Sequence, residues 1–164
     1  KGKNLKGLKM AYVGDGNNMT HSLMYAAAKT GMNFVAATPA DYAPDEGVTQ
    51  RAQEDAKETG ASIALVTDPL AAAKDADILV TDTWASMGQE AEHEERKKIF
   101  APYQINGDLL AAADKRAIVM HCLPAYRGEE ITDDVLEKFS DVIFDEAENR
   151  LHTQKAIMAL LMAD

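Results

Sequence analysis

The sequence alternates short apolar runs with longer segments of helical periodicity, and this alternation restricts the fold more than any other feature. The apolar runs predict strands at residues 9–15, 34–38, 62–67, 77–82 and 117–121, with a shorter one at 142–144. Strands that are apolar throughout are typical of a parallel sheet covered by helices on both faces. The 164 residues are therefore predicted to form a single α/β domain over 1–164, a three-layer, doubly wound, mostly parallel and Rossmann-like fold.

Turn and capping residues mark the predicted helices, which cover residues 18–30, 47–60 and 149–162. Either Asn17 or Asn18 is expected to cap the first helix, and Gly31 is expected to end it. Gly60 is the stop signal of the second helix. Asp68-Pro69 starts a short Ala-rich helix between two strands.

Unusual polar residues gather where the predicted strands end. They occupy residues 15–18, 82–88, 121–124 and 146–150, each after a predicted strand. In doubly wound sheets, ligands bind at the carboxyl ends of the strands. We therefore expect four loops to converge on one rim and to form the functional site.

Composition and charge exclude several classes of protein. A formal net charge of −10 repels phosphate backbones, so nucleic acid is not an expected partner. The apolar runs are too short to span a bilayer and no leader peptide is recognised, so no membrane partner is expected. The single cysteine, Cys122, excludes an internal disulfide and argues against a cysteine-based metal cluster, which favours a reducing, cytoplasmic location.

The first loop, Gly14-Asp15-Gly16-Asn17-Asn18-Met19, partly matches a dinucleotide-binding fingerprint. The third glycine of that fingerprint is replaced by Met19, and the expected acid after the second strand is replaced by Thr38-Pro39. The asparagines fit a helix cap, and they fit equally well as amide donors to a ligand carboxylate beside the positive end of the helix. The loop alone does not decide between these readings.

The loop at 82–88, Asp-Thr-Trp-Ala-Ser-Met-Gly, has the composition of a small polar cup. Asp82 would attract an ammonium group, Ser86 would offer a hydroxyl, and the backbone N–H groups around Met87 would bind a carboxylate. A turn in which Asp82 caps the chain and Trp84 packs in the core explains the same residues equally well.

His121 and Cys122 place an imidazole next to a thiol, which raises the hypothesis of a Cys/His catalytic pair. Neighbouring side chains on a strand point to opposite faces, so these two are not expected to meet. A buried, unreactive cysteine is the more common case. If Cys122 is functional, a polar and steric contact to substrate is favoured over a covalent nucleophile.

Among the remaining charged residues, Arg150 is the strongest candidate for a site. It lies at the predicted start of the last helix, where the helix dipole does not favour a cation, and arginine suits bidentate recognition of oxyanions. The other histidines lack metal-ligand spacing and are expected to be solvated or capping: His21, His93 and His152. The charged run at 90–98, which includes Arg96, is expected to form an exposed helix face.

Taken together, the four loops resemble the C-terminal half of ornithine carbamoyltransferases. The matching stretches are Gly-Asp-Gly-Asn-Asn-Met at 14–19, Asp-Thr-Trp-Ala-Ser-Met-Gly at 82–88, His-Cys-Leu-Pro at 121–124 and Glu-Asn-Arg-Leu-His-Thr-Gln-Lys-Ala-Ile-Met at 148–158. Each motif is weak alone, but their order along the chain is specific. The resemblance implies transfer of the carbamoyl group of carbamoyl phosphate to the δ-amine of L-ornithine, without a metal or organic cofactor, by a trimer-based homo-oligomer.

The resemblance also implies roles for seven residues. Asn18 and the backbone at Met87 would hold the ornithine carboxylate, and Asp82 and Ser86 would hold its α-amino group. Cys122 and the carbonyl of Leu123 would lie near the attacking amine and the carbamoyl group, and Arg150 would bind that group. A shaped site that aims a deprotonated amine at a carbonyl, with donors for the developing charge, suits this chemistry.

Full-length members of this family carry an N-terminal carbamoyl-phosphate domain with Ser-x-Arg-Thr and His-Pro-x-Gln motifs, and neither motif occurs in this sequence. The chain is therefore expected to fold but to be inactive alone. The predicted last helix is apolar on nearly every side towards its end, which is typical of a buried helix. Without its partner, this helix is expected to fray, to dock elsewhere or to drive self-association.

Three alternatives remain at this stage. The chain fits a sister carbamoyltransferase that acts on another amine, such as putrescine or an acetylated ornithine. It also fits a non-catalytic module that keeps an amino-acid site. The third alternative is a nucleotide-binding oxidoreductase domain, which rests on the incomplete glycine fingerprint at 14–19.

Overall fold

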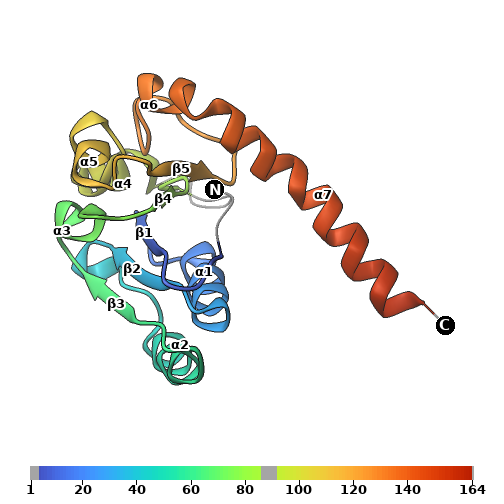
Figure 1. The fold of residues 1–164 in the computed structure, drawn as a ribbon. Coiled ribbons are helices and arrows are strands. Elements are labelled where there is room, and N and C mark those ends of the chain that lie inside the picture. The colour runs from blue at the N-terminus through green and yellow to red at the C-terminus, as the bar shows by residue number, and fades with distance from the viewer. Residues whose placement is uncertain (1–3, 86–91, 164) are drawn as a thin grey trace.

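Five parallel strands form one sheet in the computed structural model, which describes residues 4–85 and 92–163 (Figure 1). The strand order is β3-β2-β1-β4-β5. Val13 pairs with Ala37 on one side of β1, and Tyr12 pairs with Val80 on the other. The strands are β1 (Lys9–Val13), β2 (Asn33–Ala37), β3 (Ile63–Val66), β4 (Ile78–Thr81) and β5 (Ile118–His121). The predicted doubly wound α/β fold is confirmed.

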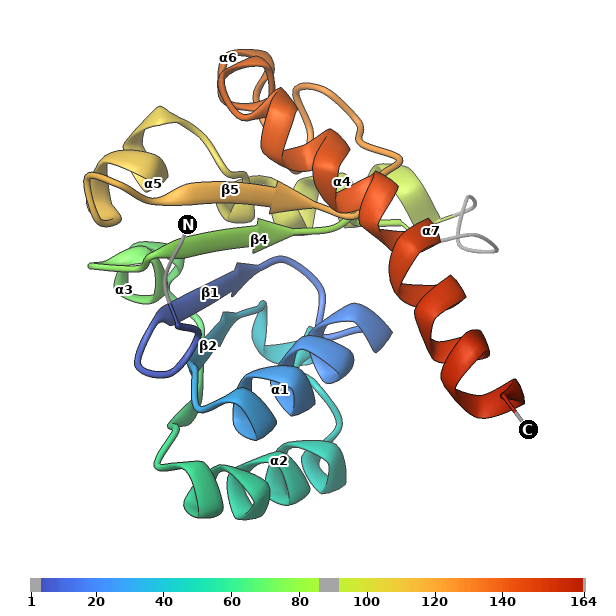
Figure 2. The same cartoon turned by 45° about the vertical axis from the view of Figure 1, so that its right-hand side comes forward.

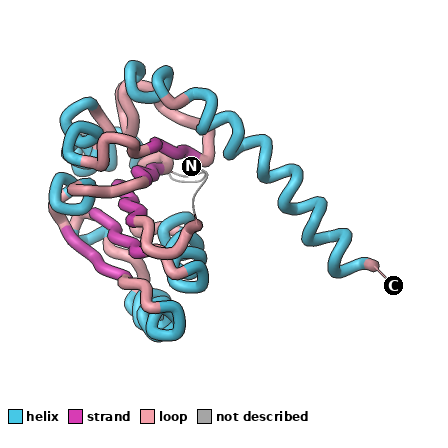
Figure 3. Tube along the Cα trace, viewed as in Figure 1, coloured by secondary structure: helices cyan, strands magenta, loops and turns pink. Residues whose placement is uncertain are grey.

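Helices cover both faces of the sheet, so the domain has the three predicted layers (Figure 3). Within β1, Tyr12 packs in one core cluster, while Ala11 and Val13 pack in the other. The helices α1 (Asn18–Thr30) and α2 (Glu46–Thr59) lie together on the first face (Figure 2). The second face is covered by α3 (Pro69–Ala73), α4 (His93–Phe100), α5 (Gly107–Ala112), α6 (Asp133–Lys138), the start of α7 (Ser140–Met162) and the short helical turn η3 (Ala101–Tyr103).

The helix boundaries follow the capping signals in the sequence. The side chain of Asn17 accepts hydrogen bonds from the backbone N–H groups of Met19 and Thr20, so Asn17 is the cap of α1 and the side chain of Asn18 is not needed for that role. Gly31 ends α1 and Gly60 ends α2, both with the positive φ that favours glycine.

Gly16, in the loop after β1, is required by close contact with another loop. Its N–H donates to the carbonyl of Tyr42 at 2.9 Å, next to the turn η1 (Ala40–Tyr42). A Cβ atom at Gly16 would lie 2.3 Å from the backbone nitrogen of Pro44 and 2.5 Å from the Tyr42 carbonyl oxygen. The glycine that suggested a dinucleotide fingerprint therefore serves chain packing.

Replacing Gly16 with alanine is expected to lower the free energy of unfolding by about 1–3 kcal/mol, because backbone atoms of residues 42–44 would have to move. Urea denaturation followed by circular dichroism measures this change. Gly107→Ala is the matched control, since a Cβ atom there meets nothing within 4 Å. Equal stabilities of the two variants would contradict the packing role of Gly16.

The predicted strand at 142–144 is wrong, because these residues belong to α7 (Ser140–Met162). No glycine or proline interrupts the sequence from 140 to 162, so a single helix forms across the whole stretch. Within the run, Ile143 is fully buried, whereas Phe144 is 59% exposed. Residues 146–150 consequently lie on a helix and not in a loop after a strand. The short helices α5 and α6 were not predicted.

The C-terminal half of α7 extends away from the domain (Figures 1 and 2). It is helical to Met162. Leu160 and Leu161 are 80% and 81% exposed, and Leu151, Ile157, Met158 and Met162 are also exposed. Burial of this apolar helix against the other half of the protein stays a prediction. None of the helices in the described part of the chain has the length and apolar character that a membrane crossing requires.

Candidate functional site

A cavity of about 680 Å³ opens at the carboxyl ends of the strands. The order of the strands reverses between β1 and β4, and this is the position at which doubly wound sheets bind ligands. The predicted site residues that border the cavity are Asn18, Asp82, Cys122, Leu123 and Arg150. Ser86 and Met87 lie outside the described residues. Three of the four predicted loops supply this cavity, and the fourth contribution comes from helix α7.

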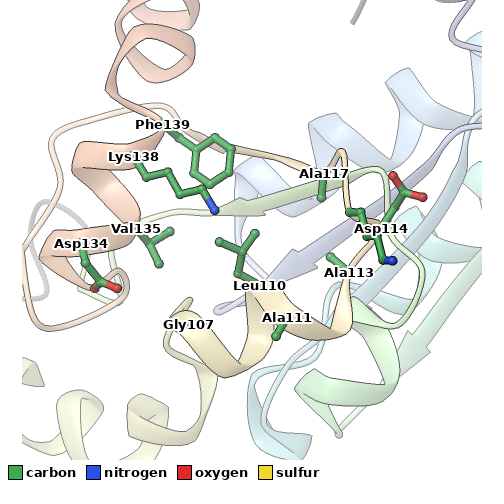
Figure 4. Close-up of a pocket in the computed structure, with 11 residues that line it drawn as sticks. Gly107, Leu110, Ala111, Ala113, Asp114, Ala117, Asp134, Val135, Lys138 and Phe139 are labelled. Atoms are coloured by element: carbon green, nitrogen blue, oxygen red, sulfur yellow. The ribbon is translucent and has the colours of Figure 1, made fainter.

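A second cavity, of about 610 Å³, lies between α5, α6 and the segment before β5 (Figure 4). Apolar side chains form much of its wall, including Leu110, Val135 and Phe139. The ammonium group of Lys138 lies 5.3 Å from the centre of the Phe139 ring. None of the five predicted site residues that the structure describes lines this cavity, so the candidate site is the one at the strand ends.

Asp82 is held in place by three donors. Its carboxylate accepts from the backbone N–H of Thr83 at 2.8 Å, from the thiol of Cys122 at 3.2 Å and from the side-chain amide of Asn17 at 3.2 Å. These bonds join the ends of β1, β4 and β5 at a single carboxylate. A buried and oriented carboxylate of this kind is suited to bind an ammonium group.

The thiol of Cys122 is kept protonated. Burial, followed by the negative charge of Asp82, raises the pKa of Cys122 to about 12. The thiol donates to Asp82 and is therefore a poor nucleophile at neutral pH. This geometry favours the predicted polar contact over covalent catalysis.

Alkylation of Cys122 by iodoacetamide is expected to be slow at pH 8, because a pKa of about 12 leaves only about one thiol in ten thousand ionised. The rate should rise about tenfold per pH unit between pH 8 and pH 10. Mass spectrometry of the intact chain after timed alkylation measures it, with free cysteine as the reference. Alkylation at the rate of free cysteine would contradict the raised pKa.

His121 and Cys122 have separate partners, as the strand geometry predicts. The buried ring of His121 places Nε2 3.0 Å from Oε1 of the buried Glu130, and its Nδ1 accepts from the backbone N–H of Leu123 at 2.9 Å. Since Nδ1 is an acceptor, the neutral ring carries its proton on Nε2 and donates it to Glu130. This pair fixes the backbone at Leu123, whose carbonyl follows directly.

Asp82, His121 and Cys122 also hold ligand-type atoms within 4.8 Å of one another. A metal ion there would have to displace the Leu123 N–H from His121 and a proton from Cys122. The hydrogen bonds that these groups already form account for their proximity without a metal.

Arg150 reaches the cavity from α7, one turn beyond the residue that attaches this helix to the sheet. That residue is Glu146, whose carboxylate accepts from the backbone N–H of His121 at 3.0 Å. Burial raises the pKa of Glu146 above its usual range. This attachment was not predicted from the sequence. The one feature that could have indicated it is the position of Glu146 four residues before Arg150.

The other described charged residues of the run at 90–98 form the predicted exposed helix face, but Arg96 does not. Arg96 is only 3% exposed, because its guanidinium donates to Asp15 and to the carbonyl of Trp84, which lie in two different loops. His93, whose side chain is 31% exposed, also borders the cavity and lies 3.1 Å from Glu129.

The other two histidines behave as predicted. His21 accepts from the backbone N–H of Asp45 at 3.0 Å, which is a capping role, and the exposed His152 lies 3.1 Å from Glu148.

The arrangement has opposite polarities at its two sides. Asn18 is the first residue of α1, where the helix dipole favours an anion, and its side-chain amide is not used to cap the helix. Asp82 provides the negative side across the crevice. A ligand with a carboxylate and an ammonium group on one carbon would match both sides, with its remaining length directed towards Cys122, Leu123 and Arg150.

Comparisons with known proteins give the same picture. Residues 6–161 match the model of the aspartate/ornithine carbamoyltransferase family, Asp/Orn binding domain. An ornithine carbamoyltransferase of Thermococcus kodakarensis is 58% identical over 158 residues, which cover 96% of this chain and 50% of the relative.

Solved structures agree. The ornithine carbamoyltransferase from Pyrococcus furiosus aligns with a TM-score of 0.90 at 57% identity, over 96% of this chain and 50% of that one. The anabolic enzyme from Campylobacter jejuni aligns with a TM-score of 0.91 at 40% identity, over 96% of this chain and 53% of that one. The chain thus spans about half the length of the relatives it matches. It belongs to the aspartate/ornithine carbamoyltransferase family, as its Asp/Orn-binding domain.

Proposed function

We propose that this chain is the L-ornithine-binding half of an ornithine carbamoyltransferase. The observation that carries the proposal is the single cavity bordered by Asn18, Asp82, Cys122, Leu123 and Arg150. The first two residues are suited to an amino-acid head group, and the other three lie where the side chain of that amino acid would end. The names of the relatives support ornithine as the substrate.

In this proposal, Asn18 and the backbone at Met87 hold the α-carboxylate, and Asp82 and Ser86 hold the α-ammonium group. The δ-nitrogen lies near Cys122 and the carbonyl of Leu123, whose sulfur and oxygen accept from its N–H groups and leave its lone pair free. The lone pair of the deprotonated δ-amine attacks the carbonyl carbon of carbamoyl phosphate, the C–O bond to phosphate breaks, and the proton lost by the nitrogen leaves with the phosphate. The guanidinium of Arg150 binds the carbamoyl group.

Carbamoyl phosphate is proposed to bind mainly to the other half of the protein, since the chain spans about half the length of its relatives. The chain alone is therefore proposed to be inactive. A trimer-based homo-oligomer is proposed for the whole protein, by its family. The free thiol of Cys122 supports a reducing, cytoplasmic location.

Calorimetric titration with L-ornithine tests this function. It is made on the chain alone and on the chain mixed with carbamoyl phosphate and with the half of the Thermococcus kodakarensis relative that this chain does not match. We expect binding of L-ornithine and release of citrulline on complementation. Titrations with putrescine and N-acetylornithine serve as controls for the head group. Preference for either control would favour a sister carbamoyltransferase.

A non-catalytic amino-acid-binding module is the second candidate, favoured by the position of Asn18 and Asp82, the groups proposed to bind the head group, at one cavity of this chain. Tight ornithine binding by the chain alone, with no citrulline on complementation, would support the module and contradict the enzyme. Absence of ornithine binding under every condition would overturn both candidates.

A further inference from the structure

Arg96, on helix α4, has the environment of a residue that holds a site together. Its side chain is almost fully buried, and its guanidinium lies 4.8 Å from the centre of the Tyr42 ring and 5.0 Å from that of Phe100. Two of its nitrogens donate in different directions, Nη2 to Asp15 and Nε to the carbonyl of Trp84. Moving a charged guanidinium out of water costs free energy, which its hydrogen-bond partners must offset. Arg96 therefore does not behave as one of the solvated charges of an exposed helix face.

The two groups that Arg96 binds lie on opposite sides of the crevice between β1 and β4. Asp15 is in the loop after β1, three residues before Asn18, and Trp84 is in the loop after β4, two residues after Asp82. One guanidinium therefore connects the loop that carries Asn18 with the loop that carries Asp82. A second link crosses the same crevice nearer the cavity, where the side chain of Asn17 donates to Asp82 at 3.2 Å.

The guanidinium also separates the roles of two neighbouring carboxylates. Burial raises the pKa of Asp15, the positive charge of Arg96 opposes that rise, and the nearby charge of Asp82 adds to it. Because Arg96 neutralises Asp15, the charge of Asp15 does not compete with that of Asp82 for a cation in the cavity. Lysine could keep the charge, but it cannot donate from two fixed nitrogens to two loops at once.

We propose that Arg96 is a positioning residue that sets the spacing between the carboxylate-binding side of the cavity, at Asn18, and its ammonium-binding side, at Asp82. It does so by binding Asp15 and the Trp84 carbonyl together, and it touches no substrate. The inference rests on the proposed function, because the two sides are those of an amino-acid head group. Arg96 would thus determine how well the site distinguishes an α-amino acid from a ligand with a single charged group.

The test compares Arg96→Lys with the wild-type chain and with Arg51→Lys. Arg51 is the matched control, since it is exposed on α2 and donates to the carbonyl of Gly47 in its own helix. Ornithine affinity is measured by calorimetry with the complementing half present, and folding by circular dichroism. We expect Arg96→Lys to remain folded and to bind L-ornithine roughly 30-fold more weakly, which is within the effect of a small misplacement of binding groups. Arg51→Lys should change the affinity by less than about twofold.

A second measurement does not depend on ligand binding. The backbone N–H of Thr83 donates to Asp82, so its hydrogen exchange reports whether Asp82 is held in place. We expect Arg96→Lys to raise the exchange rate of Thr83 about tenfold. This rate should stay unchanged in Arg51→Lys. Exchange that rose equally throughout the domain would show general destabilisation and would overturn the positioning role.

The outcomes separate the two proposals. A folded Arg96→Lys chain with wild-type ornithine affinity and wild-type Thr83 exchange overturns the role of Arg96 and leaves the function intact. A wild-type chain that never binds ornithine overturns the proposed function. The hydrogen-exchange rate of Thr83 in Arg96→Lys then tests the positioning role of Arg96 by itself. If Arg96→Lys does not fold, Asp15→Asn takes its place, because it removes one end of the same link with a smaller change. The same two results are then expected, and their absence counts against the proposal.

Discussion

Replacing Asp82 with asparagine is expected to weaken L-ornithine binding by about 100-fold. A hydrogen bond to a charged group contributes about 1.5–3 kcal/mol, which corresponds to about 10- to 150-fold in affinity. We place the effect near the upper end because Asp82 is buried and directed by three donors. Asparagine keeps an acceptor for the Thr83 N–H but has no charge to offer an ammonium group. Calorimetry with the complementing half present measures the change.

Asp108→Asn is the matched control, because Asp108 is exposed in the first turn of α5, next to Gly107 at the margin of the other cavity (Figure 4). It should leave ornithine affinity unchanged. The Asp82 variant has a second signature, since loss of the neighbouring charge should lower the pKa of Cys122 and speed its alkylation at pH 9. Wild-type affinity in Asp82→Asn would exclude Asp82 from binding the head group. Faster alkylation alone would mean that Asp82 acts only on the thiol.

The sheet could be predicted from the sequence because each strand is a compact apolar run ending at a turn or polar residue. The exception shows the limit of that signal. The run at 142–144 is apolar too, but three residues do not distinguish a strand from one buried position on a helix, and Ile143 is that position. Helices α5 and α6, of six residues each, are too short to show a helical period.

The site residues that directly follow a strand could be predicted from the sequence. Residues after β1, β4 and β5 border one cavity because the carboxyl ends of parallel strands share one edge. The sequence could not say which of Asn17 and Asn18 caps α1, since both types and positions suit the role. The burial of Arg96 could not be predicted either, because its neighbours in the sequence are charged residues typical of an exposed helix face. The burial of Arg96 is offset by Asp15, a partner 81 residues away, and such pairing is visible only in three dimensions.

The paired substitution Ile157→Glu and Leu161→Glu is expected to weaken association of this chain with the other half of the protein by at least about 100-fold. The two residues are one helical turn apart on α7, so they share a face. Burial of one such side chain contributes about 1.5–3 kcal/mol, and the two together about 3–6 kcal/mol. The C-terminal half of helix α7 extends away from the domain, and Ile157 and Leu161 are 50% and 81% exposed. Since the chain spans half the length of its relatives, we propose that the other half covers this face.

Association is measured by analytical ultracentrifugation or calorimetry of this chain with the half of the Thermococcus kodakarensis relative that it does not match. Leu70→Glu is the control, because Leu70 is 53% exposed on α3, within the domain body. The paired variant should keep the circular dichroism of the folded domain, since the altered side chains are exposed. It should also lose citrulline formation on complementation, because a helix that is not docked leaves Arg150 on an unsupported segment. Association at the wild-type level would instead show that the two halves meet elsewhere. If self-association of the wild-type chain disappears in the variant but pairing is unchanged, α7 joins copies of this domain.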